Sequence, residues 1–417
     1  MMKRTAMDSD VLFLPHEIIR NILKRLPVKS LIRFQCVRKE WKNLIQNPSF
    51  VADHLQQSTH QNPPLLSECD ENDIPFLLLD SGLQVRRVPN PPSTYSLCDA
   101  SIVGSCNGLL CLVIRELNRS PHSLLLWNPA TTAVRYVPRT RTGIPSFDYC
   151  VTGFGFSSIV NDYNIVRTYA EFRSVATKAE VFSLNKGTWK AIDIGNLKGV
   201  RLEYETVTAN GAIFWFGEKK EAEDKVDVIV SFDIAKEVFT VISRPELDYK
   251  ANEKLTVYEN KLAILCDIAE VEDDDELPYK VDLWVLDEGT CASGQTLSWT
   301  KRYTSCPLSC SFDSKTIWRN QIVGKPDFVD KRTRSVLNMM NRSWTKGYTS
   351  SSPLSFSIGS TTSRRNKGRR NVLYLMNLTT NEFKRSVIPC RDTILHIYNY
   401  VESLVSVGNN YIEEYRL

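Results

Sequence analysis

The sequence lacks a long apolar run and carries almost no net charge, and both absences narrow the class of protein. No stretch of the 417 residues approaches the roughly 20 apolar residues that a membrane-spanning helix needs. The 52 basic and 48 acidic residues leave a net charge of +4. Nucleic-acid-binding and membrane-surface proteins concentrate a dominant basic charge, so we expect neither a nucleic acid nor a membrane as partner.

Histidine is scarce, and cysteines do not occur in close pairs. The five histidines show no metal-ligand spacing and no Cys-x-x-Cys pair occurs. These absences exclude a zinc-binding RING module and predict that the protein needs no metal or other cofactor. The 11 cysteines are scattered from Cys36 to Cys390 with no apolar leader ahead of them. We therefore expect reduced thiols and a cytoplasmic and/or nuclear protein.

The first 55 residues carry a helical pattern that the rest of the chain lacks. Apolar residues recur at helical spacing from Ile18 to Leu26. Pro15 suits the first helical position and Pro27 stops the helix, so the pattern predicts one helix over residues 14–27. Two shorter helices are predicted over residues 30–37 and 39–46. We expect Pro48 to close the third helix, so that residues 9–54 form a three-helix module.

Beyond this module the composition changes twice. Residues 55–75 are polar, acidic and proline-bearing, which is typical of a linker. From residue 76 onward, short apolar runs alternate with turn signals, as strands do. Two elements recur there. One is a tight polar turn ahead of an apolar run, as at Asn107-Gly108 and Asn210-Gly211, and the other is a strand, turn and strand, as in residues 124–138 and 228–242.

The repeat has a period of roughly 50 residues, which is the range of four-stranded propeller blades. We count five repeats and expect a sixth blade to pair residues 394–407 with a hairpin at 76–89, closing the ring without an open sheet edge. The predicted fold is therefore an α+β multidomain chain: a small three-helix module followed by an all-β, kelch-like propeller of about six blades over residues 76–417. Seven blades is the alternative. Residues 319–370 are polar and predict a long loop between strands. The five repeats span residues 101–139, 151–193, 204–244, 254–304 and 316–388.

These motifs resemble plant F-box proteins with an F-box-associated, kelch-like interaction domain. Residues 14–31 follow the opening of the F-box almost letter for letter, and residues 33–50 follow its second half. Downstream, residues 104–111, the Trp127-Asn128-Pro129 step and residues 153–156 match the landmarks of the associated domain. Arg38 departs from the family, which usually has Cys there, and this bears on how tightly a partner packs at that position.

The resemblance implies a function without catalysis by this chain. An F-box binds a Skp-type adaptor, which joins a cullin scaffold with its RING subunit, while the propeller binds an unknown protein substrate. The chain would then be the substrate-recognition subunit of an SCF-type (Skp-cullin-F-box) E3 ubiquitin ligase. One alternative is a scaffold that binds the adaptor without degradation. Another is a propeller enzyme such as a kelch-like copper oxidase, for which the propeller offers two histidines, His122 and His396.

The predicted contact with the adaptor rests on an excess of apolar side chains. A helical segment of about 45 residues buries little of its own surface, so some of these side chains must pack outside the module. They pack either against another protein or, if the module is an ordinary helical cap, against the propeller. Trp41, Leu44 and Ile45 are expected to close the local core. The residues predicted to face the adaptor are Leu14, Pro15, Ile18, Leu26, Pro27, Leu31 and Val37.

Two further features concern the propeller. Gly153-Phe154-Gly155 is a lone Gly-x-Gly between strands, which predicts a strand bulge or close packing at a blade junction and not a dinucleotide site. The acidic run at 270–276 and the basic run at 364–370 are interpreted as solvated loops. Target-binding loops are expected near residues 139–149, 219–225, 271–278 and 350–370.

Overall fold

A computed structural model gives the fold. It describes residues 14–408 except for gaps at 62, 70–75, 89–90, 92–99, 115–121, 141–148, 171–174, 222–223, 248–250, 269–270, 273–274, 277–278, 292–293, 307, 309–311, 327–370 and 389–393. The long loop predicted within 319–370 therefore lies mostly outside the described residues. None of the described helices combines the length and apolar character needed to cross a membrane.

The N-terminal part is a module of four short helices, which we call the helical module. Its helices are α1 (His16–Leu23), α2 (Val28–Phe34), α3 (Lys39–Gln46) and α4 (Pro48–His60). They pack around a small core in which Leu23, Leu31, Ile45 and Phe50 are almost fully buried. Since so few side chains form this core, the module gains little stability by itself.

The third helix ends at Gln46, before Pro48, as predicted, but the prediction of three helices was wrong because Pro48 begins a fourth. Asn47 caps α4 by accepting a hydrogen bond from the Ser49 backbone N–H at 2.9 Å. Proline is favoured at the first helical position, where its missing N–H has no partner to lose. The helix continues past His54, which is buried with its Nε2 3.0 Å from the Leu26 carbonyl oxygen. The module thus extends six residues beyond the predicted boundary at 54.

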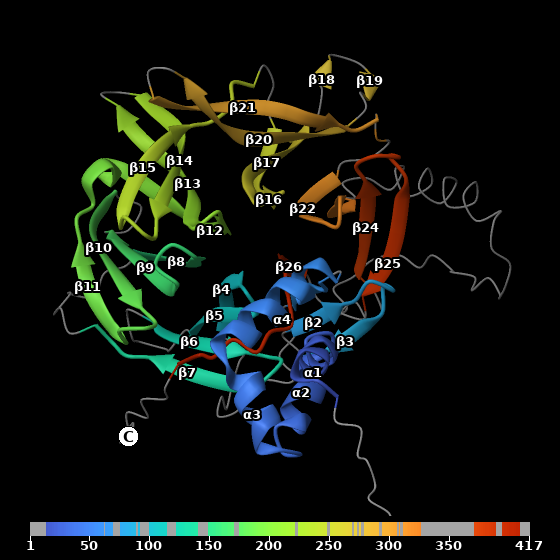
Figure 1. Cartoon of the computed structure of the whole chain (residues 1–417). Coiled ribbons are helices and arrows are strands. Elements are labelled where there is room, and N and C mark those ends of the chain that lie inside the picture. Colours follow the sequence, from blue (N-terminus) through green and yellow to red (C-terminus); the bar gives the residue numbers. More distant parts are fainter. Residues whose placement is uncertain are drawn as a thin grey trace, which may run out of the picture.

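The remaining strands form a ring of six four-stranded antiparallel sheets, which confirms the predicted six-bladed propeller (Figure 1). Blades 1 to 5 follow the five predicted repeats. Blade 1 comprises β4 (Ala100–Cys106), β5 (Leu109–Ile114), β6 (Ser123–Asn128) and β7 (Ala133–Val137). Blade 2 comprises β8 (Tyr149–Ser157), β9 (Asp162–Ala170), β10 (Ala176–Ser183) and β11 (Thr188–Ile192). Blade 3 comprises β12 (Val200–Ala209), β13 (Ala212–Glu221), β14 (Asp224–Asp233) and β15 (Val238–Ser243), preceded by the 3-10 turn η1 (Gly195–Leu197).

The last blades complete the ring. Blade 4 comprises β16 (Ala251–Tyr258), β17 (Lys261–Ile268), β20 (Lys280–Cys291) and β21 (Gly294–Thr304), with a small hairpin of β18 (Val271–Glu272) and β19 (Asp275–Glu276). Blade 5 comprises β22 (Phe312–Trp318), β23 (Gln321–Pro326), β24 (Asn371–Asn377) and β25 (Phe383–Ile388). Blade 6 combines both ends of the propeller: β26 (Ile394–Asn399), β1 (Leu65–Cys69), β2 (Phe76–Leu79) and β3 (Val85–Arg87).

Blade 6 joins the two ends of the propeller as predicted, but β26 pairs with β1 and not directly with the predicted hairpin at 76–89, which also corrects the predicted linker. Residues 55–75 are not a linker alone, because α4 occupies its beginning and β1 lies within it. β1 pairs with β26 on one side and β2 on the other, with Leu65 opposite both Asn399 and Leu79. Leu65 and Leu66 are buried between these neighbours. A five-residue strand between two prolines and an acidic run was too short to change the composition of the whole segment.

The tight polar turns recognised in the sequence join the first strand of a blade to the second. Both residues of these turns have a positive φ, the geometry of two-residue hairpin turns that asparagine and glycine adopt most easily. Such turns keep the first two strands in register with their apolar residues facing the neighbouring blades. The pairs are Asn107-Gly108, Asn210-Gly211, Glu259-Asn260 and Arg319-Asn320.

The antiparallel order of the strands gives the ring two different faces. Turns between strands one and two and between strands three and four lie on one face, and the other connections lie on the opposite face. The helical module joins the first face, where the Tyr400 N–H donates to the Pro64 carbonyl oxygen at 3.1 Å. We call this the helical face and its opposite the loop face. The four predicted target loops connect strand ends that open on the loop face, although most of their residues lie outside the described ones.

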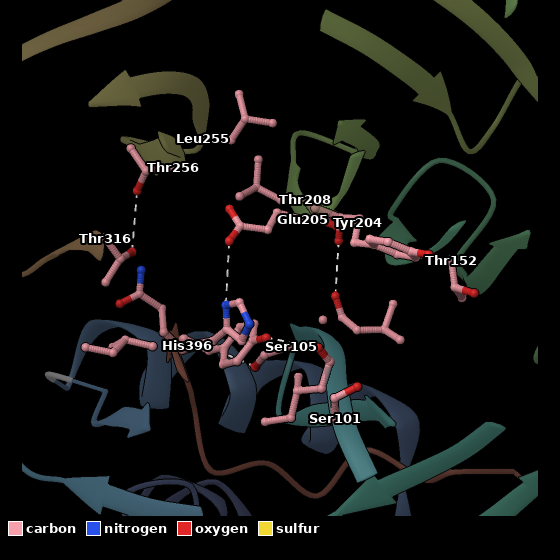
Figure 2. A pocket seen from close by; sticks show the side chains of 18 of the residues that line it. Ser101, Ser105, Thr152, Tyr204, Glu205, Thr208, Leu255, Thr256, Thr316 and His396 are labelled. Atoms are coloured by element: carbon pink, nitrogen blue, oxygen red, sulfur yellow. Dashed lines mark hydrogen bonds and ion pairs between the residues drawn. The ribbon is translucent and has the colours of Figure 1, made fainter. Parts of the chain in front are cut away.

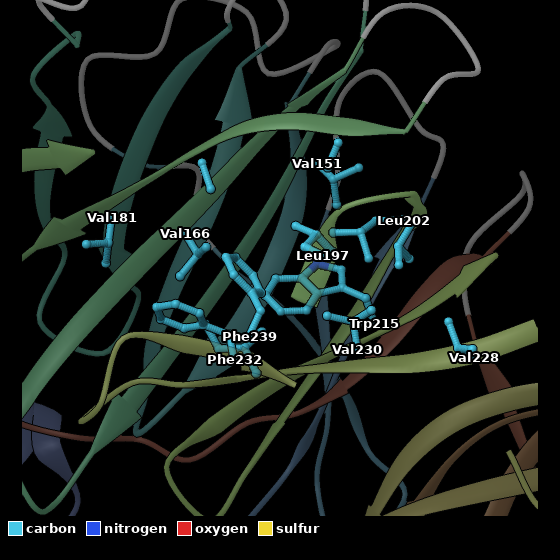
Figure 3. Packing of buried hydrophobic residues seen from close by; sticks show 14 of the residues in the cluster. Val151, Val166, Val181, Leu197, Leu202, Trp215, Val228, Val230, Phe232 and Phe239 are labelled. Atoms are coloured by element: carbon cyan, nitrogen blue, oxygen red, sulfur yellow. The ribbon is translucent and has the colours of Figure 1, made fainter. Parts of the chain in front are cut away.

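The junction between blades 2 and 3 shows why Gly153 is glycine. Trp215 is fully buried there beside Val230 and Phe239 (Figure 3). A Cβ on Gly153 would lie 2.3 Å from Trp215 Cζ2 and 2.8 Å from Ile213 Cγ2. The predicted close packing at this Gly-x-Gly is therefore confirmed.

We expect Gly153→Ala to lower the free energy of unfolding by about 1–3 kcal/mol, because the indole cannot retreat in a close-packed core. Gly104→Ala is the matched control on the inner strand of blade 1, where the added Cβ would have 3.5 Å to its nearest neighbour. Chemical denaturation of both variants measures the difference. Equal stabilities would contradict this account of the junction.

Candidate functional site

The helical module leaves five large apolar side chains open to solvent, which we call the exposed apolar set. Ile18 and Ile22 lie one turn apart on α1 and are 45% and 48% exposed. Ile32 on α2 is 38% exposed, and Leu14 and Val37 at the ends of this region are 54% and 60% exposed. A gathering of large apolar side chains in one small module is the mark of a protein-binding surface.

Of the seven residues predicted to face the adaptor, five are exposed, one is half-buried and one is fully buried. Pro15 and Pro27 are exposed together with Leu14, Ile18 and Val37. Leu26 is half-buried against the module core. Leu31 was wrongly predicted, because its side chain is fully buried among Leu23, Ile45 and Phe50.

Two members of the exposed apolar set, Ile22 and Ile32, were not among the residues predicted to face the adaptor. Ile22 follows Ile18 by four residues and so shares its face of the helix, a signal that was available in the sequence. Ile32 directly follows Leu31, and α2 turns Leu31 into the core and leaves Ile32 outside. The choice between these neighbours depends on how α2 packs against α3 and α4. Trp41, Leu44 and Ile45 lie in or against the core, as expected.

Arg38 sits where the family pattern differs, and it is exposed at the N-cap of α3. Its backbone is extended between α2 and α3, which places the residue at the helix junction. The side chain next to it, Val37, is the most exposed of the exposed apolar set. The substitution therefore leaves the packing of the module core unaffected.

A C-terminal segment, residues 400–408, fastens the helical module to the propeller. Leu404 packs against the core of the helical module. On either side of it the chain is bound to blade 1: Asn128 Nδ2 donates to the carbonyl oxygens of Ser403 and Val405 at 3.0 and 2.8 Å. Arg135 Nη1 donates to the Val407 carbonyl oxygen at 3.3 Å. The module and the propeller are therefore joined at two places, through α4 and through Leu404.

The second candidate site is a cavity of about 660 Å³ on the axis of the ring (Figure 2). The inner strands of all six blades line it with hydroxyl groups and a few charged side chains. Thr256 and Thr316 hydrogen-bond across neighbouring blades with 3.4 Å between their Oγ1 atoms. A volume of this size is in the range of ligand-binding cavities.

The ionisable groups of the cavity meet around Glu205. Its Oε1 forms an ion pair with Lys254. The same oxygen lies 3.8 Å from His396 Nδ1 (Figure 2). Burial lowers the pKa of His396, the Lys254 and Lys315 ammonium groups lower it further, and the Glu205 carboxylate opposes them. His396 is therefore mostly neutral near pH 7.

Both propeller histidines line the cavity, together with Cys150 and Tyr204. These are the residue types that a copper-binding propeller would use. Within the part of the chain that the structure describes, however, no three His, Cys, Asp or Glu side chains converge as metal ligands. Burial raises the pKa of the Cys150 thiol.

Asp267 on β17 links blade 4 to blade 5. It accepts hydrogen bonds from the Ser314 backbone N–H at 2.8 Å and from Ser314 Oγ at 2.5 Å. Burial raises its pKa from the ordinary 3.8 to about 7.

The raised pKa of Asp267 predicts a pH dependence of stability. Between about pH 4 and 7 the folded chain keeps a proton that the unfolded chain releases, so this group's contribution to stability falls as pH rises through that window. We expect Asp267→Asn, which keeps the shape and a hydrogen bond to Ser314, to become more stable relative to the wild type as pH rises to 7. Thermal unfolding at several pH values checks this, and a constant difference would contradict it.

A helical module with exposed apolar side chains, fastened to a six-bladed propeller, defines a two-domain chain. The F-box domain profile matches residues 11–53, and the F-box associated beta propeller domain profile matches residues 73–407. The second match spans most of the chain, and the chain belongs to the F-box proteins with an F-box associated beta propeller domain. The helical module contains the F-box, and we use that name for it below.

Relatives agree with this assignment. The F-box protein CPR1 of Arabidopsis thaliana is 25% identical over 329 residues, which cover 70% of this chain and 72% of that protein. A second Arabidopsis F-box protein is 26% identical over 345 residues, covering 78% of this chain and 82% of the relative. A third is 28% identical, covering 55% of this chain and 61%, less than two thirds, of the relative. One solved structure, an oligogalacturonate lyase in complex with manganese, gives a TM-score of 0.36 at 10% identity over 74% of this chain and 69% of that chain, a likeness too slight to inform function.

Proposed function

We propose that this chain is the substrate-recognition subunit of an SCF-type E3 ubiquitin ligase, working in the cytoplasm and/or nucleus. Its F-box binds a Skp-type adaptor, which connects it to a cullin and a RING subunit, and its propeller binds the target protein. The chain supplies no catalytic residue in this proposal. The observation that carries it is the exposed apolar set, which the F-box core has no room to bury.

The energetics favour a protein partner for this surface. Burying one such isoleucine or leucine contributes about 1.5–3 kcal/mol before the costs of association. Ile18 and Ile22 are four residues apart and lie exposed on one face of α1. Helices that bind in a groove of a partner protein use apolar side chains with this spacing. The fixed attachment through Leu404 supports the proposal further, because it holds the F-box in place relative to the loop face of the propeller.

The fate of the target separates this proposal from a scaffold that binds the adaptor without degradation. The full chain is expressed in cells beside an Ile18→Glu, Ile22→Glu variant, and co-purifying proteins are quantified with and without a proteasome inhibitor. We expect target proteins to bind both forms, and inhibition to raise their level only with the wild-type chain. Equal levels under all four conditions would favour the scaffold.

A further inference from the structure

Four blades each direct one ionisable side chain into the axial cavity. They are Glu205 on β12, Lys254 on β16, Lys315 on β22 and His396 on β26. Blades 1 and 2 line the same cavity with hydroxyl groups such as Ser101 and Thr152 (Figure 2), and with His122 and Cys150. We call the part of the cavity lining that blades 3 to 6 contribute, with its four ionisable side chains, the charged wall.

The two lysines of this wall keep donors for a ligand. Their side chains are only 24% and 15% exposed, so solvent reaches little of them. Lys254 forms an ion pair with Glu205, and Lys315 pairs with Asp313 at 2.8 Å. An ammonium group has three donors, and one ion pair of this kind uses one of them.

The two lysines come from neighbouring inner strands, Lys254 from β16 and Lys315 from β22. They precede Thr256 and Thr316, which are hydrogen-bonded to each other across blades 4 and 5. Lys254 and His396 both approach Glu205 Oε1, and Lys315 lines the same cavity. Each ammonium group is paired with one carboxylate, Lys254 with Glu205 and Lys315 with Asp313, so the wall offers unused ammonium donors and no net charge.

We propose that the axial cavity binds an anionic group, a carboxylate or a phosphate, with Lys254, Lys315 and His396 as its donors. An anion with several acceptor oxygens uses the remaining lysine donors and a neutral imidazole N–H at once. Ser101 and Thr152 on the opposite side give hydroxyl groups to the rest of the ligand. That the anion belongs to a target protein rests on the proposed function, whereas the anion site itself does not.

The test uses the full chain and follows its five histidines by NMR. A His396→Gln variant assigns the His396 signal, which is then titrated against pH in chloride-poor buffer with inorganic phosphate or with acetate. We expect a saturating anion to raise the pKa of His396 by about one unit, since it brings a negative charge next to the ring. A response to phosphate alone would indicate a phosphorylated target, and a response to acetate would indicate an acidic side chain or chain end.

Two variants with opposite expected effects keep the test decisive. Lys254→Met with Lys315→Met should weaken anion binding about tenfold per lysine, the effect of losing a charge-assisted hydrogen bond. Glu205→Gln should strengthen it, because Lys254 is then released from its ion pair. Lys236→Met, a change on a surface ion pair with Asp233, is the control and should leave binding unchanged.

An unchanged His396 pKa in both anions would overturn the proposal, as would equal anion binding by the wild type and the double lysine variant. Adaptor binding is measured separately on the same proteins. Failure of anion binding with intact adaptor binding would contradict the anion site but not the ligase function. Loss of adaptor binding with intact anion binding would contradict the ligase function but not the anion site.

Discussion

An Ile18→Glu, Ile22→Glu variant is expected to bind a Skp-type adaptor at least about 100-fold more weakly than the wild type, because two apolar anchors are lost and two charges are placed in the contact. Both side chains are nearly half exposed and neither belongs to the F-box core, so the variant should fold. Titration calorimetry of the full chain with purified adaptor measures the change.

The matched control for this variant is Ile159→Glu with Val160→Glu. These residues form an exposed apolar pair, 84% and 46% exposed, in the turn between β8 and β9 of the propeller. They carry the same chemical change outside the F-box and should leave adaptor binding intact. Equal weakening by both double variants would show that added charge, and not loss of the F-box surface, causes the effect.

A Leu404→Asp variant is expected to loosen the F-box without disturbing blades 2 to 5. Leu404 packs against the core that contains Leu23, Leu31 and Phe50, and a carboxylate there removes apolar contact and introduces an unpaired charge. We expect a loss of about 2–4 kcal/mol, which a module with so small a core cannot withstand. Hydrogen exchange should become faster throughout α1 to α4.

The control for this experiment is Ser406→Asp, which places the same charge two residues away on an exposed position of the C-terminal segment. Its hydrogen exchange should match that of the wild type. If Leu404→Asp leaves exchange of the four helices unchanged, the C-terminal segment does not hold the F-box, and the relative placement of the two domains depends on α4 alone.

Much of this architecture was predictable because it depends on local patterns. Turns such as Asn107-Gly108 and Asn210-Gly211 need a positive φ, and that need is visible in the residue types. The apolar hairpins that follow these turns recur five times along the chain, so the number of blades could be predicted by counting them. The pairing of β26 with the early strands followed from the need to remove open edges.

The parts that escaped prediction depend on tertiary packing. Leu31 and Ile32 are adjacent and equally apolar, and only the packing of α2 decides which is buried. β1 is too short to be recognised until β26 and β2 are placed on either side of it. The charged wall of the cavity joins Glu205, Lys254 and His396, which are distant in sequence and come together only when the ring closes.

Binding of a Skp-type adaptor by the exposed apolar set is tested most directly by mixing the purified full chain with the adaptor and mapping the complex by hydrogen exchange. The account predicts a 1:1 complex with protection over residues 14–37, where the exposed apolar set lies, and no change in the inner strands of the propeller. Failure to form a complex, or protection confined to the propeller, would contradict it.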